Sequence, residues 1–211
     1  MAAGEMTAHS ENRGPQDVLR RLRTGTAPEH EDVERTLDLL APGLDRSRLI
    51  QVLGRMHGFW VAAEAGLDQW ASGSADAAAA VSWPRRRRAA LFAGDLRTLR
   101  AAPGAEIPRL SAGTGTDQAF GRLYVLEGST LGGASIDRHL ASLPFLTDVR
   151  LRAFSPYGPE TGAMWAAFRR AARARVASGG DADAMIASAR DTFRALAGWC
   201  RPVESVLGAT A

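Results

Sequence analysis

One segment of the chain reads Gly121-Arg122-Leu123-Tyr124-Val125-Leu126-Glu127-Gly128-Ser129-Thr130-Leu131-Gly132-Gly133-Ala134-Ser135-Ile136-Asp137, and it says more about the fold than any other. It lies in the middle of a predicted helix, roughly residues 117–140, although it holds four glycines. Each glycine inside a helix costs about 1 kcal/mol relative to alanine, so the segment gives up about 4 kcal/mol of helix preference. A helix that carries this cost usually needs its backbone bare so that something can lie against it.

The spacing of these glycines predicts where the bare backbone lies. At about 100° per residue, Gly128 and Gly132 share one face of the helix, with Ser129 and Gly133 on the adjoining strip. The result is a surface about two turns long that carries almost no side chain. It suits either a neighbouring helix or a flat ligand.

Composition predicts an all-α fold. Hydrophobic residues make up 45% of the 211 residues, which is enough for one large core. Alanine, leucine and arginine dominate, whereas β-branched residues and tyrosine are few. All 26 basic side chains are arginine, and the formal net charge is only +3. We therefore expect no nucleic-acid partner.

Other features of the chain bound its class and its location. The single cysteine, Cys200, excludes an intrachain disulfide and a zinc site built on cysteines, which favours a reducing cytoplasm. No apolar run approaches about 20 residues, so we expect no membrane span. Residues 1–14 are small and polar and read as a disordered tail rather than a signal peptide. We expect one helical domain over 15–205 and a flexible C-terminus over 206–211.

Hydrophobic periodicity and the positions of proline and glycine divide the chain into seven or eight helices with short links. This pattern is typical of a compact bundle. Pro28 suits the first turn of a helix that stops near Pro42, and Asp45 or Ser47 caps a long helix that follows. The predicted helices cover about 16–23, 28–40, 46–70, 84–99, 117–140, 160–177 and 181–201, and part of 71–83. Residues 101–115 and 143–159 are predicted as irregular.

The run Arg85-Arg86-Arg87-Arg88 follows Trp83-Pro84. We interpret it as the solvated first turns of the helix over 84–99. A docking patch for an acidic partner protein is the alternative.

A flat cofactor on the glycine face would need an opposite wall and an axial ligand, and four histidines are candidates. His9 lies in the expected tail, and His139, near a helix end, suits a charged or capping role. His57 lies on a mostly apolar helix, as a hydrogen-bonded core histidine would. His30 is the best ligand candidate, since the carboxylate of Glu34 one turn on could orient its second nitrogen directly or through water. A surface histidine near a helix start would share this pattern.

Four segments of the chain, in order, resemble the bacterial heme oxygenases, especially those associated with bacteriophytochromes. The segment from Leu22 to Glu34 resembles the family's proximal segment, whose histidine binds the heme iron. Met56-His57-Gly58-Phe59-Trp60 with Glu64 resembles the second long helix. Leu123-Tyr124-Val125-Leu126-Glu127-Gly128-Ser129-Thr130-Leu131-Gly132-Gly133 is very similar to the distal helix, and Tyr157-Gly158 followed by Gly162-Ala163-Met164-Trp165 and Phe168 resembles the late Tyr-Gly and Trp segment.

The resemblance implies a heme-oxygenase-like helical bundle that cleaves heme b to biliverdin, CO and ferrous iron with O₂ and electrons. Heme is then both cofactor and substrate, with His30 as iron ligand. The expected catalytic positions are Gly128, Ser129, Gly132 and Gly133. Ser129 stands where animal-type members carry an aspartate that anchors distal water.

Cations are expected to hold the heme propionates, since arginine suits carboxylate recognition. Arg23 lies seven residues before His30, about 10.5 Å away on the same face of a continuous helix. Arg169, Arg170 and Arg173 are the other candidates, and Tyr157 with Glu34 completes the expected cofactor-binding set.

The chain carries no fingerprint for binding nicotinamide or flavin, so electrons would come from a ferredoxin-type or other reductase. A bacteriophytochrome is a candidate acceptor of the biliverdin. Two alternatives remain open: a heme carrier or sensor of the same fold with little turnover, and a relative that acts on another small molecule through a cysteine nucleophile, for which only Cys200 is available.

Overall fold

A computed structural model of the chain describes residues 17–111 and 115–201. The regular secondary structure of these residues is all helical, which confirms the predicted all-α bundle. The helices are α1 (Val18–Gly25), α2 (Ala27–Leu37), α3 (Arg46–Gly73), α4 (Ala75–Ala80), α5 (Ala89–Thr98), α6 (Thr116–Ala141), α7 (Thr161–Ala177) and α8 (Ala182–Cys200). Short 3₁₀ turns are η1 (Trp83–Arg86), η2 (Pro144–Leu146) and η3 (Gly158–Glu160). The expected tails over 1–14 and 206–211 lie outside the described residues.

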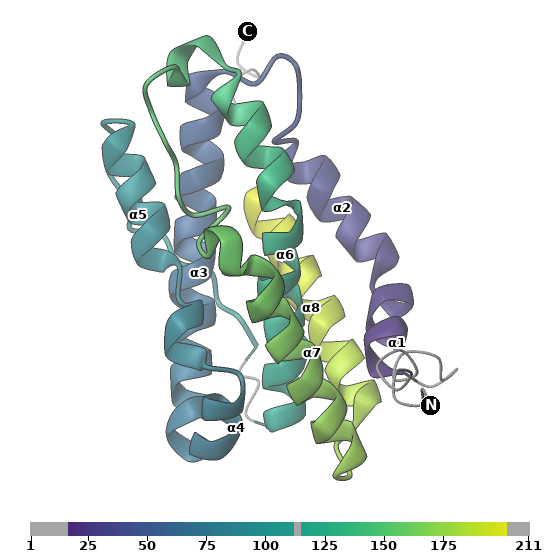
Figure 1. The fold of residues 1–211 in the computed structure, drawn as a ribbon. Helices are drawn as coiled ribbons and strands as arrows, with labels where there is room; N and C mark the ends of the chain where they lie inside the picture. Colours follow the sequence, from purple (N-terminus) through teal and green to yellow (C-terminus); the bar gives the residue numbers. More distant parts are fainter. Residues whose placement is uncertain (1–16, 112–114, 202–211) are drawn as a thin grey trace, which may run out of the picture.

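The long helices form a bundle around α6 (Figure 1). In this view α2, α6 and α8 rise while α3 and α7 descend, and α5 lies on the opposite side of the bundle from α1 and α2. α6 packs mainly against α8 and α7, α3 packs against α5 and α8, and α2 packs on α8. The glycine-rich helix is thus the central element of the fold.

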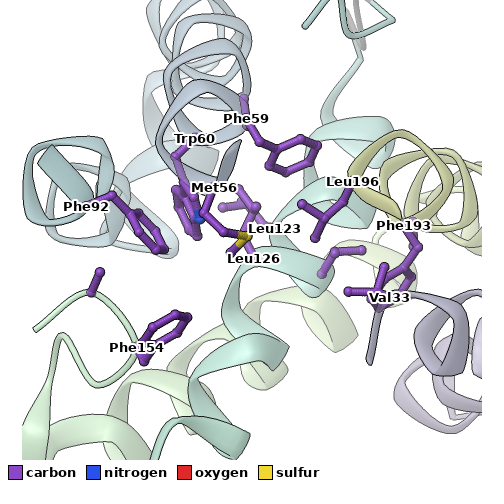
Figure 2. Close-up of a cluster of buried hydrophobic side chains, with 14 of the residues drawn as sticks. Val33, Met56, Phe59, Trp60, Phe92, Leu123, Leu126, Phe154, Phe193 and Leu196 are labelled. Carbon is purple, nitrogen blue, oxygen red and sulfur yellow. The ribbon is translucent and has the colours of Figure 1, made fainter. Parts of the chain in front are cut away.

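Aromatic and aliphatic side chains from five helices meet in the core (Figure 2). Trp60 of α3 lies 6.1 Å from Phe92 of α5, and Phe92 meets Phe154 edge-on at 5.8 Å. On the other side, Leu123 of α6 and Leu196 of α8 are fully or almost fully buried. Burial of such side chains contributes about 1.5–3 kcal/mol each, so this core is the main source of stability.

Side-chain caps fix several helix starts where the sequence predicts them. The Asp45 carboxylate accepts the backbone N–H of Arg48 at 2.7 Å at the start of α3. Asp181 accepts the N–H groups of Asp183 and Ala184 at 2.8 and 3.0 Å at the start of α8. Each cap satisfies backbone donors that have no partner inside the helix.

The predicted helix over 84–99 is wrong over residues 84–88. The chain forms η1 and then turns, and α5 begins only at Ala89. Arg86 and Arg88 are 0% and 2% exposed, so two of the four arginines point into the protein. Their burial draws the backbone out of helical geometry and overturns the solvated-helix interpretation for these two residues.

None of the helices in the described parts of the chain is long and apolar enough to cross a bilayer.

Candidate functional site

The glycines of α6 serve two different purposes. A Cβ atom on Gly121 would collide with the carbonyl oxygen of Met185 in α8, and one on Gly133 would collide with the carbonyl oxygen of Phe154. A Cβ atom on Gly128 or Gly132 would meet no other described atom within 4 Å. Gly121 and Gly133 therefore permit close packing, whereas Gly128 and Gly132 leave bare helix facing open space.

The open face also carries an apolar side chain. Leu131, between the two glycines in sequence, is 52% exposed, although its neighbour Thr130 is buried. A large apolar side chain beside bare backbone is a surface that an apolar ligand would cover.

Tyr124 connects α6 to the junction between α1 and α2. Burial raises the pKa of Tyr124, against the opposing effects of a side-chain hydrogen bond with Thr26 and of the charge of Arg23. Thr26 is itself buried and donates its hydroxyl to the carbonyl of Leu22 at 2.8 Å. The N-terminal segment is thereby tied to the glycine-rich helix at one point.

The positions of His30 and Gly128 can be counted from Thr26 and Tyr124. His30 lies one helical turn beyond Thr26 on α2, and Gly128 lies one turn beyond Tyr124 on α6. Because α2 and α6 run in the same direction (Figure 1), the same step along each helix leads from the shared contact to the imidazole and to the bare backbone.

His30 is not packed into the core. Its side chain is 52% exposed, and its ring meets Phe193 of α8 edge-on at 5.5 Å. Nδ1 lies 3.7 Å from the Glu34 carboxylate, which is close but longer than a hydrogen bond. With Nδ1 on the side of Glu34, Nε2 is the nitrogen available to bind a metal.

A buried charge cluster lies behind the open face, and we define it as Arg86, Arg88, Glu127 and Tyr157. Glu127 accepts a hydrogen bond from Arg86 at one oxygen and from the Tyr157 hydroxyl, at 2.8 Å, at the other. Arg88 lies 3.5 Å from Glu127 and stacks its guanidinium over the Trp60 ring at 4.6 Å. Burial raises the pKa of Tyr157, and the charge of Glu127 adds to the effect, so the phenol stays neutral.

Sequence reasoning missed most of this cluster. Four consecutive arginines have no helical or strand periodicity, so nothing in the run marks Arg86 and Arg88 as buried. The available signal was Glu127, a carboxylate in an otherwise apolar part of the glycine-rich helix. Since a buried carboxylate requires a partner, its position could have prompted a search for a buried arginine.

Ser129, a predicted site residue, is tied to this cluster. Its hydroxyl accepts a hydrogen bond from Arg88 Nη1 at 3.1 Å and donates to the Leu126 carbonyl at 2.7 Å. The residue as a whole is exposed, next to Gly128.

The predicted carboxylate-binding residues lie in different settings. Arg23 is exposed, and the helix breaks after Gly25, so the continuous-helix spacing of 10.5 Å between Arg23 and His30 does not apply. Arg169 Nε is buried without a hydrogen-bond partner among the described residues. Arg173 donates to both oxygens of Asp17 at 3.1 and 2.9 Å, Arg170 is exposed, and Tyr157 belongs to the buried charge cluster.

His57, His139 and Cys200 have other settings. His57 is half-buried, and its Nδ1 has no partner among the described residues, so the expected hydrogen bond at that nitrogen is not made. Burial lowers the pKa of His57. His139 Nε2 lies 3.1 Å from the Ala41 carbonyl, and His9 lies outside the described residues. Cys200 is buried, which raises the pKa of its thiol to about 12 and speaks against a cysteine nucleophile.

These residues fit a heme group. Heme needs an imidazole for its iron, a flat apolar wall for its ring and cations for its carboxylates. His30 offers an available Nε2, the backbone at Gly128 and Gly132 with exposed Leu131 offers the wall, and Arg23 and Arg169 offer guanidinium donors.

Solved structures share this fold. A heme oxygenase from Neisseria meningitidis, determined with NO and CO bound, is 22% identical, with a TM-score of 0.73 over 90% of this chain and 96% of that chain. Heme oxygenase-2 from Synechocystis sp. PCC 6803, in complex with heme and NO, is 18% identical, with a TM-score of 0.68 over 88% of this chain and 84% of that chain. No curated protein matches the sequence.

A family model described as heme oxygenase matches residues 16–201. This match takes in every helix described above, including the segment of His30 and the glycine-rich helix. The chain therefore belongs to the heme oxygenase family.

Proposed function

We propose that this chain cleaves heme to biliverdin, CO and ferrous iron, using O₂ and electrons from a separate donor. Family membership supports heme degradation in general. The observation that supports the finer proposal is the open Gly128–Gly132 face of α6, together with the half-exposed His30 imidazole on α2. Bound heme supplies both the iron that activates O₂ and the ring that is cut.

His30 is the proposed iron ligand. Glu34 faces Nδ1, which keeps the proton on that nitrogen and leaves Nε2 free to bind. Phe193 supports the ring edge-on and limits its rotation. With one face of the iron held by His30, the other face is left for O₂.

The bare face of α6 is proposed to shape the O₂ side. Gly128 and Gly132 would let the helix backbone approach a bound heme closely, because neither carries a side chain and the space beside each is open. Ser129 and Gly133 are proposed to help hold ordered water for proton delivery. Gly133 contributes by letting α6 sit close to the Phe154 backbone.

Cations are proposed to bind the two heme carboxylates. Arg23 is exposed near Tyr124, and Arg169 has an unused buried Nε. Arg173 already engages Asp17, so it would serve only by exchanging that partner. The Tyr157 hydroxyl donates to Glu127, so Tyr157 would act indirectly, as part of the buried charge cluster.

We further propose a cytoplasmic setting with a ferredoxin-type or other reductase as electron donor, and a bacteriophytochrome as the acceptor of biliverdin. A single buried free cysteine is compatible with a reducing compartment.

Absorption spectroscopy of the purified protein with hemin tests the proposal. Wild type is expected to give the Soret band of a histidine-ligated heme, and His30→Ala is expected to lose it. Reduction under air should then convert the wild-type spectrum to that of biliverdin. A stable oxygenated or ferric spectrum would instead identify a carrier or sensor.

A bulky residue on the open face gives a second test. Gly132→Leu is expected to retain hemin binding while it abolishes or redirects ring opening, because the side chain occupies the space over the heme. Chromatography of the products measures this. Unchanged biliverdin output would remove Gly132 from the proposal.

A further inference from the structure

Ser129 links the buried charge cluster to the open face. Arg88 is 2% exposed, and its Nη2 donates to the Leu126 carbonyl at 2.8 Å while its Nη1 donates to the Ser129 hydroxyl at 3.1 Å. The same guanidinium stacks between the rings of Trp60, at 4.6 Å, and Tyr157, at 5.7 Å. Arg88 is therefore rigidly held, and Ser129 is its contact on the side of Gly128.

The four residues of the cluster, taken alone, hold two cations and one carboxylate. Two guanidinium groups, those of Arg86 and Arg88, share the carboxylate of Glu127, and the phenol of Tyr157 is neutral. Glu64 approaches from α3, but its carboxylate accepts the backbone N–H groups of Arg88 and Ala89 at 2.5 and 2.7 Å. Glu64 therefore adds a second carboxylate near the backbone of Arg88, while the Arg88 guanidinium lies 3.5 Å from a carboxylate that Arg86 also binds.

Ser129 is suited to transmit this charge. Its oxygen accepts from Arg88, so its own proton is the stronger donor, because hydrogen bonds in a chain polarise one another. That proton now points to the Leu126 carbonyl. It can turn about the Cβ–Oγ bond without moving the oxygen, and can thus be offered to a ligand beside Gly128.

We propose that Arg88 is a positioning residue of the open face: through the Ser129 hydroxyl it directs a polarised hydrogen-bond donor and a positive potential at anionic ligands bound over Gly128 and Gly132. The inference rests on the proposed function, since it assumes a heme on that face. Preorganised donors of this kind act strongly in a water-poor site, because they need no reorganisation when negative charge arrives. Arg88 itself makes no contact with the ligand.

Fluoride binding to the ferric hemin complex tests the proposal, since fluoride is an anion that only accepts hydrogen bonds. Ser129→Ala and Arg88→Met are each expected to weaken fluoride binding about tenfold, which corresponds to one lost charge-assisted hydrogen bond. Arg88→Lys keeps the positive charge but loses the planar group with two donors, so its fluoride affinity is expected to lie between those of wild type and Arg88→Met. Arg87→Met is the matched control, because it removes an equal charge from an exposed arginine paired with Asp68.

The C–O stretching frequency of the ferrous CO complex gives a readout with an uncharged ligand. It is expected to rise in Ser129→Ala and Arg88→Met, because a positive potential near the ligand lowers it, and to stay at the wild-type value in Arg87→Met. A general loosening of the fold would not separate these variants in this order.

Three outcomes are distinguishable. If wild type forms no hemin complex, the proposed function fails. If wild type binds hemin but Ser129→Ala, folded by circular dichroism, keeps wild-type fluoride affinity and CO frequency, the inference about Arg88 alone is overturned. If Arg88→Met does not fold, Ser129→Ala decides, since Ser129 is exposed and the Leu126 carbonyl that accepts from its hydroxyl also accepts from Arg88.

Discussion

Gly132 and Gly133 are neighbours on α6, yet a methyl group has opposite expected effects at the two positions. Gly132 faces open space, so alanine there gains helix preference, about 1 kcal/mol, without a clash. Gly133 meets the Phe154 carbonyl, so alanine there forces the backbone apart and costs about 1–3 kcal/mol. Denaturant unfolding of the two heme-free variants measures the difference.

A second pair of glycines on α6 checks the same argument. Gly128→Ala is expected to behave like Gly132→Ala, and Gly121→Ala, which meets α8, like Gly133→Ala. Equal stabilities across the four variants would contradict the division of these glycines into packing and open positions.

This division also marks what sequence reveals at the residue scale. The count and spacing of the glycines predicted a bare surface, and the motif directed attention to His30. The tie between Thr26 and Tyr124 was not predicted, because it depends on two side chains about 100 residues apart in sequence whose approach only the packing of the helices decides.

At the scale of secondary-structure elements, local rules predicted the boundaries where a cap is present. Asp45 and Asp181 both cap the helices that they were expected to start or precede, since capping uses only residues within one turn. The local rules did not predict η1. There the backbone conformation is set by buried ion pairs with a distant helix rather than by local helix preference. Tertiary contacts overrode helix propensity at that point.

Substitutions of the η1 arginines test whether buried ion pairs set the conformation of this turn. Arg86→Met leaves Glu127 without its closest cationic partner in the core and is expected to cost about 3–5 kcal/mol in unfolding free energy. Arg85→Met removes only an exposed pair with Glu160 and should cost at most about 1 kcal/mol. Urea unfolding compares the two, and equal losses would rule out burial as the cause of the turn.

The tie between α6 and α7 is expected to depend on pH. Arg175 donates two hydrogen bonds to the Asp117 carboxylate, at 2.8 and 3.0 Å, which holds the pKa of Asp117 below its ordinary value of 3.8. The unfolded chain then binds this proton more tightly than the folded one. The pair's contribution, about 1 kcal/mol, is full above about pH 4 and is lost as the pH falls through the folded-state pKa.

Unfolding free energies of wild type and Asp117→Asn between pH 7 and pH 2 measure this. The difference between the two proteins should shrink toward zero at the acid end. Asp76→Asn is the control, since Asp76 also lies in the first turn of a helix but is exposed. A difference for Asp117→Asn that stays constant with pH would show that the carboxylate does not stabilise the fold through its charge.

For the whole molecule, the composition and helical periodicity predicted an all-α bundle, and family membership agrees with it. Composition and periodicity could not predict which contacts hold α2 against α8. Glu29 of α2 is 9% exposed, and its carboxylate accepts hydrogen bonds from Arg190 and Arg194 of α8, each at 2.8 Å. These partners lie more than 160 residues from Glu29 in sequence, and exposed arginines in an arginine-rich chain give no sign of a specific partner.

Since these ion pairs hold α2 on α8, a heme bound between His30 and the open face of α6 would add a second attachment for α2. A ligand that binds only the folded state adds about 2.7 kcal/mol of stability at a free concentration of 100 times its Kd. For a chain of this length, that corresponds to a rise of about 5–10 °C in Tm. We expect hemin to raise the Tm of wild type by this amount.

Two histidine variants separate the heme contribution from general stability. His30→Ala is expected to keep the Tm of the heme-free protein, because the ring is half-exposed, but to lose most of the rise with hemin. His139→Ala removes the contact with the Ala41 carbonyl, so it should lower the heme-free Tm and keep the rise. Thermal unfolding of the three proteins with and without hemin measures both quantities. If His30→Ala keeps the full rise with hemin, heme does not join α2 to α6 through this imidazole, and the proposed iron ligand is wrong.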